Sequence, residues 1–320
     1  MNEFEIIRHY FRELTPPATG EILGIGDDCA LLALAAGEQL VVSTDSLVAG
    51  RHFAHSVAPY DLGYKALAVN LSDLAAMGAS PRWFTLALTL DRFEPEWLQE
   101  FARGMSELAR TSGIGLVGGD TTRGPLNINV TVMGAVEPGR AMRRDGARIG
   151  DVICVTGTLG DAALALRLAG DAREAQACMG DDLRFLQTRL HRPEPRIAAG
   201  RQLSVWAHAA VDISDGLAAD LSHILAASHV GAELIEADLP QSGAFLRCCE
   251  SQQRRAHLLH GGDDYELCIC MPEDDFLKAQ AASPTALVRI GRVVEGENLS
   301  LIEATGDKLV IPPHGFRHFE

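Results

Sequence analysis

Six short segments of the chain combine carboxylates with glycine, serine and threonine. In chain order they read GIGDDC, STDS, LSDLAAMG, GGDTTRG, DISDG and GGDDYE. Any one of them is typical of a helix cap or a turn, because Asp, Ser and Thr side chains accept hydrogen bonds from backbone N–H groups left unpaired there. Several nevertheless hold more carboxylates than a cap requires. This excess favours a cation-binding role over a purely structural one.

The position of five aspartates supports a cation site. Asp212 and Asp215 lie three residues apart at a predicted strand-to-helix turn, and Asp73 lies in a helical, otherwise apolar stretch where an unpaired carboxylate is costly. Asp45 and Asp120 are each predicted to end a hydrophobic strand, where α/β sheets place their ligand sites. Converging carboxylates destabilise a fold unless a cation neutralises them, and all-oxygen ligands suit Mg²⁺. The sequence therefore predicts a site for several Mg²⁺ ions.

Other segments could bind phosphate. Gly115–Gly124 (GLVGGDTTRG) is predicted to be a glycine-rich turn with exposed N–H groups, and the segments GTLGD and DISDG could present helix N-termini to an anion. Arg144 and Arg148 could bind phosphate oxygens in a bidentate manner, or be solvated charges of a linker. None of these segments is a Walker A sequence, and no GxGxxG fingerprint precedes a predicted helix, so the familiar nucleotide motifs are missing.

Histidine and cysteine offer little further chemistry. His52 is the one histidine tied to an acidic segment, seven residues after Asp45, although packing in a loop would also explain it. The seven cysteines are odd in number and mostly in apolar settings, so we expect all of them to be reduced thiols. Cys268 and Cys270 are one residue apart and lack the spacing of a zinc site.

The elements that must position these residues form two groups. A chain of 320 residues favours two domains. The segment 137–151, rich in Gly and Arg, is predicted to be a linker, so we expect two α/β domains, 1–145 and 146–320. Periodicity predicts a buried strand over QLVVSTDSLV with a polar end at residues 43–45, and a helix beginning near Asp215. Further predicted helices cover residues 3–13, 61–79, 94–111, 159–168, 182–191 and 197–203; further predicted strands include 83–90, 126–136 and 209–213.

Composition restricts the partners. The formal net charge is −15, from 43 acidic and 28 basic side chains, which argues against nucleic acid and anionic membrane surfaces. We find no apolar window long enough for a transmembrane helix, and the N-terminus lacks the pattern of a signal peptide. These features predict a cytoplasmic protein.

Taken together, the acidic segments resemble a known family. GIGDDCALL, STDSLVAGRHF, YKALAVNLSDLAAMGA, GGDTTRGPL, DISDGL and GGDDYEL, in this order, are similar to the motifs of the thiamine-monophosphate kinase family. That family belongs to an ATP-dependent superfamily with aminoimidazole ribonucleotide synthetase and selenophosphate synthetase. The resemblance covers almost the whole chain. It implies the aminoimidazole ribonucleotide synthetase-like α/β fold, with mixed sheets flanked by helices, and a homodimer in which the N-terminal sheets pair.

The resemblance also implies roles for individual residues. Asp263 stands where the family commonly has Glu, which keeps the charge on a shorter side chain. Asp27 and Arg148 are of second rank, with Asp27 expected to make a turn hydrogen bond or to hold a metal-bound water. The positions that match Mg²⁺ ligands are Asp28, Ser43, Thr44, Asp45, Asp73, Asp120, Asp212 and Asp215; those that match nucleotide contacts are Gly119, Asp120, Arg144 and Ser214; those that match substrate contacts are His52, Asp263 and Phe316.

The implied reaction transfers the γ-phosphoryl group of ATP to thiamine monophosphate, giving ADP and thiamine diphosphate, the last step of thiamine diphosphate biosynthesis. Both partners are anionic, so several Mg²⁺ ions would be needed to cancel their repulsion. Because the second pKa of a phosphate monoester is about 6, the acceptor is already a nucleophile, and we expect no general base and no covalent nucleophile. The alternatives are a sister enzyme with another acceptor, a non-catalytic nucleotide or thiamine-phosphate binding protein, and a metal-dependent phosphatase.

Overall fold

The computed structural model describes residues 2–316 and divides the chain into two compact units. The N-terminal unit holds the residues up to Leu74 together with Ala79–Gly139, and the C-terminal unit holds Ala75–Gly78 together with the residues from Arg140 onward. The two units are described separately below. Within residues 2–316, none of the helices combines the length and the apolar character that a membrane crossing requires.

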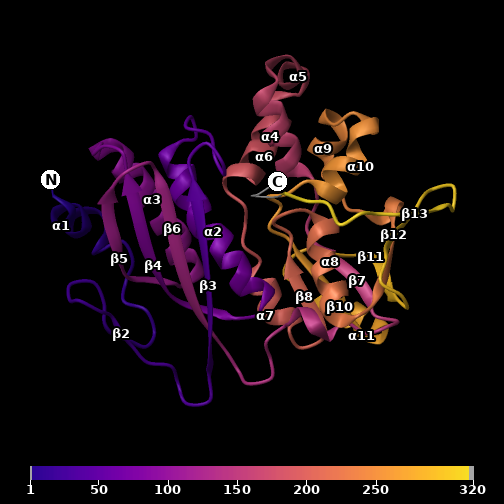
Figure 1. Cartoon of the computed structure of the whole chain (residues 1–320), viewed down its shortest axis with the longest axis horizontal. Helices are drawn as coiled ribbons and strands as arrows, with labels where there is room; N and C mark the ends of the chain where they lie inside the picture. The colour runs from indigo at the N-terminus through magenta and orange to yellow at the C-terminus, as the bar shows by residue number, and fades with distance from the viewer. Residues whose placement is uncertain (1, 317–320) are drawn as a thin grey trace. The chain divides into compact units, whose positions relative to one another are not determined.

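The N-terminal unit is built on a four-stranded sheet in the order β3-β6-β4-β5. β6 pairs antiparallel with both β3 and β4, and β4 and β5 run parallel. Two long helices, α2 and α3, accompany the sheet, and a small sheet of β1 and β2 precedes it (Figure 1). The bounds are α1 Glu3–Ile6, β1 Glu21–Leu23, β2 Leu31–Leu32, β3 Gln39–Val48, α2 Pro59–Ala76, β4 Ser80–Leu90, α3 Pro95–Ser112, β5 Gly115–Arg123 and β6 Asn127–Val136.

Two glycines bring α2 and α3 into backbone contact. A Cβ at Gly63 would lie 2.0 Å from the Phe101 carbonyl oxygen, and a Cβ at Gly104 would lie 2.0 Å from the Tyr60 carbonyl oxygen. Any larger residue at either position would force the helices apart. Further along α2, residues Leu67–Leu71 are almost entirely buried.

The strand over QLVVSTDSLV has the predicted bounds, but the prediction that it is buried is wrong. β3 is an edge strand that pairs only with β6 in the sheet, and most of its residues are exposed. The side chains of Leu40, Val42 and Val48 are 49%, 55% and 41% exposed. Asp45 also lies within this strand rather than at its end. An apolar run cannot distinguish an edge strand with one open face from a strand in the middle of a sheet.

The glycine-rich turn predicted at Gly115–Gly124 is also wrong. Residues 115–123 form β5, whose backbone pairs with β4 over Trp83–Leu90, and Asp120 lies inside the strand rather than at its end. Gly119 is required there because a Cβ would lie 1.9 Å from the Leu86 carbonyl oxygen. The glycines of this segment therefore allow close approach of two strands, and the pairing occupies amides that a turn would have exposed.

The C-terminal unit is built on a seven-stranded sheet in the order β13-β12-β9-β11-β7-β10-β8. Its neighbouring strands are antiparallel except β12 and β9, which run parallel. The strands are β7 Val152–Thr156, β8 Ala209–Asp212, β9 Gly231–Ile235, β10 Leu267–Met271, β11 Leu287–Val294, β12 Leu299–Ile302 and β13 Lys308–Val310. The helices are α4 Asp161–Gly170, α5 Ala172–Ala177, α6 Gly180–His191, α7 Ile197–Leu203, α8 Leu217–Ser228, α9 Gly243–Cys248, α10 Ser251–His260 and α11 Glu273–Ala282, with 3₁₀ turns at Arg144–Gly146 and Glu236–Asp238.

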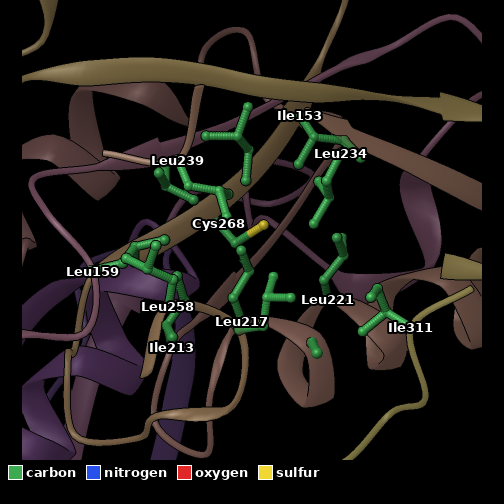
Figure 2. Packing of buried hydrophobic residues seen from close by; sticks show 14 of the residues in the cluster. Ile153, Leu159, Ile213, Leu217, Leu221, Leu234, Leu239, Leu258, Cys268 and Ile311 are labelled. Atoms are coloured by element: carbon green, nitrogen blue, oxygen red, sulfur yellow. The ribbon is translucent and has the colours of Figure 1, made fainter. Parts of the chain in front are cut away.

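Helices cover both faces of this sheet, and alternate strand residues enter two cores. Cys268 and Cys270 of β10 point to the core formed with α4, α6, α8, α9 and α10, part of which is drawn in Figure 2. Leu267 and Ile269 point to the second core, formed with α7 and α11. Because both faces are covered, β7 and β10 are buried at every position, and all their residues except Thr156 are apolar, as expected for central strands.

Three predicted elements differ from the structure. The helix predicted over residues 3–13 is a short α1 followed by a π-helix at Ile7–Phe11. The helix predicted near Asp215 begins at Leu217. The predicted linker is packed at Met142 and Ala147, which are 2% and 7% exposed, and it contains the 3₁₀ turn at Arg144–Gly146.

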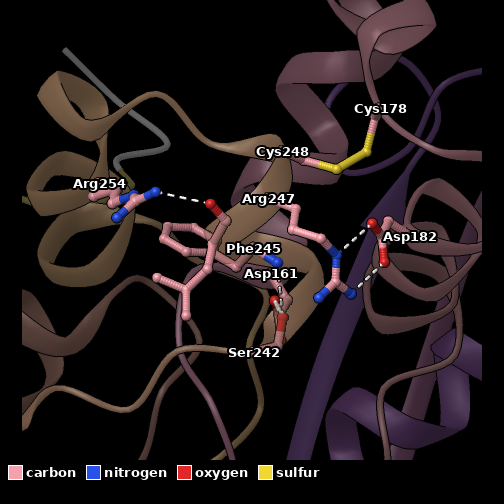
Figure 3. Close-up of a disulfide and its surroundings, with 9 residues drawn as sticks. Asp161, Cys178, Asp182, Ser242, Phe245, Arg247, Cys248 and Arg254 are labelled. Atoms are coloured by element: carbon pink, nitrogen blue, oxygen red, sulfur yellow. Dashed lines mark hydrogen bonds and ion pairs between the residues drawn. A yellow bond between two sulfur atoms is a disulfide. The ribbon is translucent and has the colours of Figure 1, made fainter.

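The prediction that all seven cysteines are reduced is wrong for one pair. A disulfide joins Cys178, after α5, to Cys248, the last residue of α9 (Figure 3). Beside it, the Arg247 guanidinium donates hydrogen bonds of 2.8 and 2.7 Å to the two carboxylate oxygens of Asp182 on α6. The ends of α5 and α9 therefore meet although they are 70 residues apart in the sequence, and cysteine spacing gives no sign of it.

Breaking this disulfide should lower the melting temperature. Cross-linking a loop of 70 residues stabilises a fold by about 4 kcal/mol in the chain-entropy description. We expect Cys248→Ser, measured by calorimetry without reductant, to melt several degrees below the parent protein, and added dithiothreitol to lower the parent to the same value. Cys29→Ser is the control, because Cys29 is an exposed free thiol. Equal melting of Cys248→Ser and the parent would contradict a stabilising role for the bond.

Candidate functional site

The acidic residues of the N-terminal unit are positioned by β3 and α2. The Ser43 hydroxyl donates a 2.6 Å hydrogen bond to the Asp73 carboxylate, so these two predicted metal ligands lie together. The Asp45 N–H donates at 3.0 Å to the side-chain oxygen of Asn70, and the Asn70 amide donates at 3.0 Å to the Ala66 carbonyl one turn earlier. Asn70 is 1% exposed and thereby fixes the backbone of β3 against α2.

Thr44 lies on the opposite face of the same sheet. Strand residues alternate between faces, so Thr44 and Ser46 point away from α2. The Asn129 amide of β6 confirms this, because it donates to the Ser46 hydroxyl at 2.8 Å and to the Thr44 hydroxyl at 3.4 Å. Across the sheet, Ser46 pairs with Asn129, Asn129 with Ala87, and Ala87 with Asp120. The exposed Asp120 side chain therefore lies on the same face as Ser46. The sheet therefore separates Ser43, Asp45 and Asp73 from Thr44 and Asp120 within this unit.

Asp28 and His52 lie in loops of the N-terminal unit. The Asp28 carboxylate is exposed between β1 and β2, and its N–H donates at 2.8 Å to the Asp27 carboxylate. This is the turn hydrogen bond expected of Asp27. His52 Nδ1 accepts a hydrogen bond of 2.9 Å from the Val48 N–H at the end of β3, which leaves the proton of a neutral ring on Nε2.

In the C-terminal unit, Asp212, Ser214 and Asp215 belong to one loop between β8 and α8. Asp212 is 5% exposed at the end of β8. The N–H groups of Ser214, Asp215 and Gly216 all donate at 3.0 Å to one carboxylate oxygen of Asp220 in the first turn of α8. Burial raises the pKa of Asp220 to about 7, against the three N–H donors that lower it. These amides are therefore occupied by a carboxylate of the protein.

The second predicted anion-binding turn, GTLGD, is occupied in the same way. The Gly160 N–H, at the start of α4, donates at 2.8 and 3.1 Å to the two carboxylate oxygens of Asp264. Asp264 is 1% exposed, and burial raises its pKa well above the ordinary value. The prediction that DISDG offers free amides to phosphate is therefore wrong, and in GTLGD the Gly160 amide is likewise taken by a buried aspartate.

Predicted substrate contacts lie against the same loop of the C-terminal unit. The Asp263 N–H donates at 2.9 Å to the Ser214 carbonyl, and the Phe316 N–H donates at 3.3 Å to the Asp215 carbonyl. Asp263 has a φ of 68° and accepts a 3.1 Å hydrogen bond from the hydroxyl of Tyr265, whose φ is 51°. Two left-handed residues that are not glycine, so close together, mark a segment held by its surroundings, as is common at ligand sites.

Buried charges hold that segment from behind. The Glu266 carboxylate is fully buried and accepts hydrogen bonds of 2.6 Å from both Nε and Nη2 of Arg196. It also accepts from Arg189 at 2.8 Å and from the Thr156 hydroxyl at 2.6 Å. Asp161 is buried nearby, and burial raises its pKa. Its carboxylate accepts a 2.6 Å hydrogen bond from the Thr158 hydroxyl and another of 2.6 Å from the Ser242 hydroxyl, the latter drawn in Figure 3.

The predicted nucleotide-binding arginines lie in the 3₁₀ turn and just after it. Both Arg144 and Arg148 are exposed. The Arg144 carbonyl accepts a 2.8 Å hydrogen bond from the Ser228 hydroxyl, and the Arg148 N–H donates at 2.9 Å to Asp151. The Arg144 backbone is thus bonded to α8 and the Arg148 backbone to Asp151, while both residues are exposed.

The donor set suits Mg²⁺, although no protein cage is formed. Within residues 2–316, no group of three or more His, Cys, Asp or Glu side chains is close enough to hold a metal ion. The predicted ligands contribute only carboxylate and hydroxyl oxygens, in small groups such as Ser43 with Asp73. Mg²⁺ typically takes one or two carboxylates and completes its shell with water and substrate phosphates. The residues therefore fit Mg²⁺ that arrives with a phosphorylated ligand.

Sequence reasoning missed the residues that fix these loops. Asn70 precedes Asp73 by one helical turn on α2, and Asp220 lies in the apolar stretch LAADLSHIL. The argument that singled out Asp73, a carboxylate on an otherwise apolar helix, applies equally to Asp220 and could have found it. Glu266 belongs to the acidic segment GGDDYE, but nothing in the sequence indicates its partner Arg196, 70 residues away.

Comparisons with known proteins agree with this architecture. The family model "AIR synthase related protein, N-terminal domain" matches residues 26–136, and "AIR synthase related protein, C-terminal domain" matches residues 148–303. Thiamine-monophosphate kinase of Escherichia coli (strain K12) is 48% identical over 271 residues, which cover 85% of this chain and 83% of that protein.

Solved structures give the same result. Thiamine-monophosphate kinase from Stenotrophomonas maltophilia K279a superposes with a TM-score of 0.84 at 48% identity, covering 88% of this chain and 91% of that chain. A structure described as "AaThiL complexed with AMPPCP and TMP" superposes with a TM-score of 0.79 at 32% identity, covering 90% and 89%. These matches confirm the two-domain α/β fold and the resemblance seen in the motifs. The chain belongs to the thiamine-monophosphate kinase family of AIR synthase related proteins.

Proposed function

We propose that this protein transfers the γ-phosphoryl group of ATP to the phosphate of thiamine monophosphate, forming ADP and thiamine diphosphate. The observation that carries the proposal is 48% identity to thiamine-monophosphate kinase of Escherichia coli over 85% of this chain. The related structure described as complexed with AMPPCP and TMP supports the same pair of substrates.

The residues of this chain would act by binding and positioning. We assign Mg²⁺ ligation to Asp28, Ser43, Thr44, Asp45, Asp73, Asp120, Asp212 and Asp215, nucleotide contacts to Gly119, Asp120, Arg144 and Ser214, and acceptor contacts to His52, Asp263 and Phe316. Bound Mg²⁺ supplies charge neutralisation between the two anionic substrates. The acceptor phosphate is itself the nucleophile, since its second pKa is about 6, and so no side chain needs to remove a proton.

A single assay tests this function. The purified protein is incubated with ATP, Mg²⁺ and thiamine monophosphate, and thiamine diphosphate is measured by chromatography. We expect one thiamine diphosphate for each ADP, with chelation of Mg²⁺ abolishing the product. ADP formation without thiamine diphosphate would instead indicate a sister enzyme or an ATPase. A phosphorylated protein able to pass its phosphate to thiamine monophosphate would refute direct transfer.

We also propose that the protein is a homodimer that pairs through the open face of the N-terminal sheet. Leu40, Val42 and Val48 of β3 lie on that face, and each is more than 40% exposed. An edge strand with such an exposed apolar row is suited to packing against a second copy. The polar residues between them, Thr44 and Ser46, would then be brought into the interface.

Val42→Asp should therefore separate the subunits. A carboxylate in a packed apolar interface loses its hydration without a partner, so we expect the mass measured by light scattering to fall from that of a dimer to that of a monomer. Leu277→Asp is the matched control, because Leu277 on α11 is 73% exposed and lies in the other unit. A parent protein that is already monomeric, or a dimer unaffected by Val42→Asp, would contradict this interface.

A further inference from the structure

The loop between β8 and α8 has every backbone polar group paired from Ile213 to Gly216. The N–H groups of residues 214–216 go to Asp220, and the Ile213 N–H goes to the Glu266 carbonyl at 2.8 Å. The four carbonyls accept, in order along the chain, from the N–H groups of Tyr265, Asp263, Phe316 and Asp220, at 2.8, 2.9, 3.3 and 3.0 Å. Complete pairing gives the loop one conformation.

The chain also requires glycine at the end of this loop. Gly216 has a φ of 115°, and a Cβ there would lie 2.9 Å from the backbone of His260. The turn can therefore close tightly enough for three successive N–H groups to reach one oxygen. Asp220 itself is 4% exposed, so its carboxylate is shielded from solvent, and it accepts the hydrogen bonds of the loop.

We propose that Asp220 is a positioning residue for cation binding: its carboxylate fixes the loop 212–216 so that Asp212 and Asp215 are presented to Mg²⁺. Because Asp220 occupies the amides, the loop has no N–H donors left between Ser214 and Gly216 to attract a bare phosphate. The same loop carries the carboxylates of Asp212 and Asp215 and the hydroxyl of Ser214, which are oxygen ligands of the kind that a hard cation binds. The inference rests on the proposed function only for the identity of that cation.

Removing the Asp220 carboxylate should weaken cation binding without removing a ligand. Asp220→Ala leaves three N–H groups in a buried loop without their acceptor, and such a loop rearranges to pair them elsewhere. We expect the dissociation constant of Mn²⁺, measured by electron paramagnetic resonance in the presence of AMPPCP, to rise at least tenfold. Asp220→Asn keeps an acceptor but loses the charge, so we expect an intermediate rise of about threefold, because charge-assisted hydrogen bonds are roughly twice as strong as neutral ones.

Asp171→Ala is the matched control. Asp171 caps α5 in the same unit, where its carboxylate accepts from the N–H groups of Arg173 and Glu174 at 2.9 and 3.1 Å. A loss of helix capping alone would lower the melting temperature in both variants and leave Mn²⁺ binding unchanged, and that result for Asp220→Ala would overturn the proposal. If Asp220→Ala does not fold, Asp220→Asn decides, and unchanged Mn²⁺ affinity in that variant overturns the proposal equally.

The readout also separates this inference from the proposed function. Mn²⁺ binding does not require turnover or thiamine monophosphate. A parent protein that makes no thiamine diphosphate, together with weakened Mn²⁺ binding in Asp220→Ala, would reject the proposed function and support the role of Asp220. If the parent protein forms thiamine diphosphate and both Asp220 variants bind Mn²⁺ as the parent does, the proposed function is supported and the role of Asp220 is rejected.

Discussion

Asp45→Asn should reduce thiamine diphosphate formation by about 100-fold or more, the scale on which a single charge-stabilising group acts in catalysis. The substitution removes one negative charge and keeps the size of the side chain. The backbone of β3 at this position is held by the hydrogen bond from the Asp45 N–H to Asn70, which does not involve the carboxylate. We therefore expect the melting temperature without Mg²⁺ to be unchanged or slightly raised.

The control for this prediction is Asp91→Asn, an exposed aspartate just after β4 in the same unit. We expect it to retain the rate of the parent protein. Titration of Mg²⁺ in the assay then distinguishes a weakened metal site, which excess Mg²⁺ partly restores, from a lost transition-state contact, which it does not. Near-normal turnover of Asp45→Asn at low Mg²⁺ would remove Asp45 from the proposed ligands.

The sequence predicts the long periodic elements well. The bounds of β3 and α7 agree with the structure, and α2 and α3 differ by only a few residues. What it does not predict is exposure, because the apolar run of β3 is the same whether or not a second layer covers it. Whether a strand lies at the edge depends on how the whole sheet is assembled, and the sequence of residues 39–48 does not indicate it.

For the candidate site, the residue types were predictable and their arrangement was not. Ser43 and Thr44 are neighbours in a strand, so they point to opposite faces, and a grouping by sequence proximity conceals this. The sequence DISDG is consistent with an anion-binding turn, but in the structure its amides donate their hydrogen bonds to the Asp220 carboxylate. A motif fixes the donors and acceptors that are present, whereas their partners come from residues outside the motif.

Glu266→Gln should be among the most destabilising single substitutions in the C-terminal unit. Glu266 is fully buried and accepts two hydrogen bonds from Arg196, whose side chain is 8% exposed. A glutamine can accept through its oxygen, but its amide would face guanidinium N–H groups as a second donor. Leaving a buried guanidinium without its buried counter-charge costs about 3–5 kcal/mol, or a fall in melting temperature of at least about 6 °C.

The matched control is Glu194→Gln, because both glutamates bind Arg196. The Glu194 carboxylate accepts from Nη1 of Arg196 at 2.7 Å but is 71% exposed, so solvent screens its charge. We expect this variant to lose no more than about 1 kcal/mol. Equal melting temperatures for the two variants would show that burial does not strengthen the pair.

A double substitution tests why Glu266 matters. If the cost of Glu266→Gln comes from the stranded guanidinium, then Arg196→Met in the same protein removes that group and should restore part of the stability. The double variant should then melt above Glu266→Gln alone. If the cost instead comes from losing the anchor of the segment that carries Asp263 and Tyr265, the second substitution adds to the loss. In that case the Michaelis constant for thiamine monophosphate should rise in both variants, while that for ATP stays near the value of the parent protein.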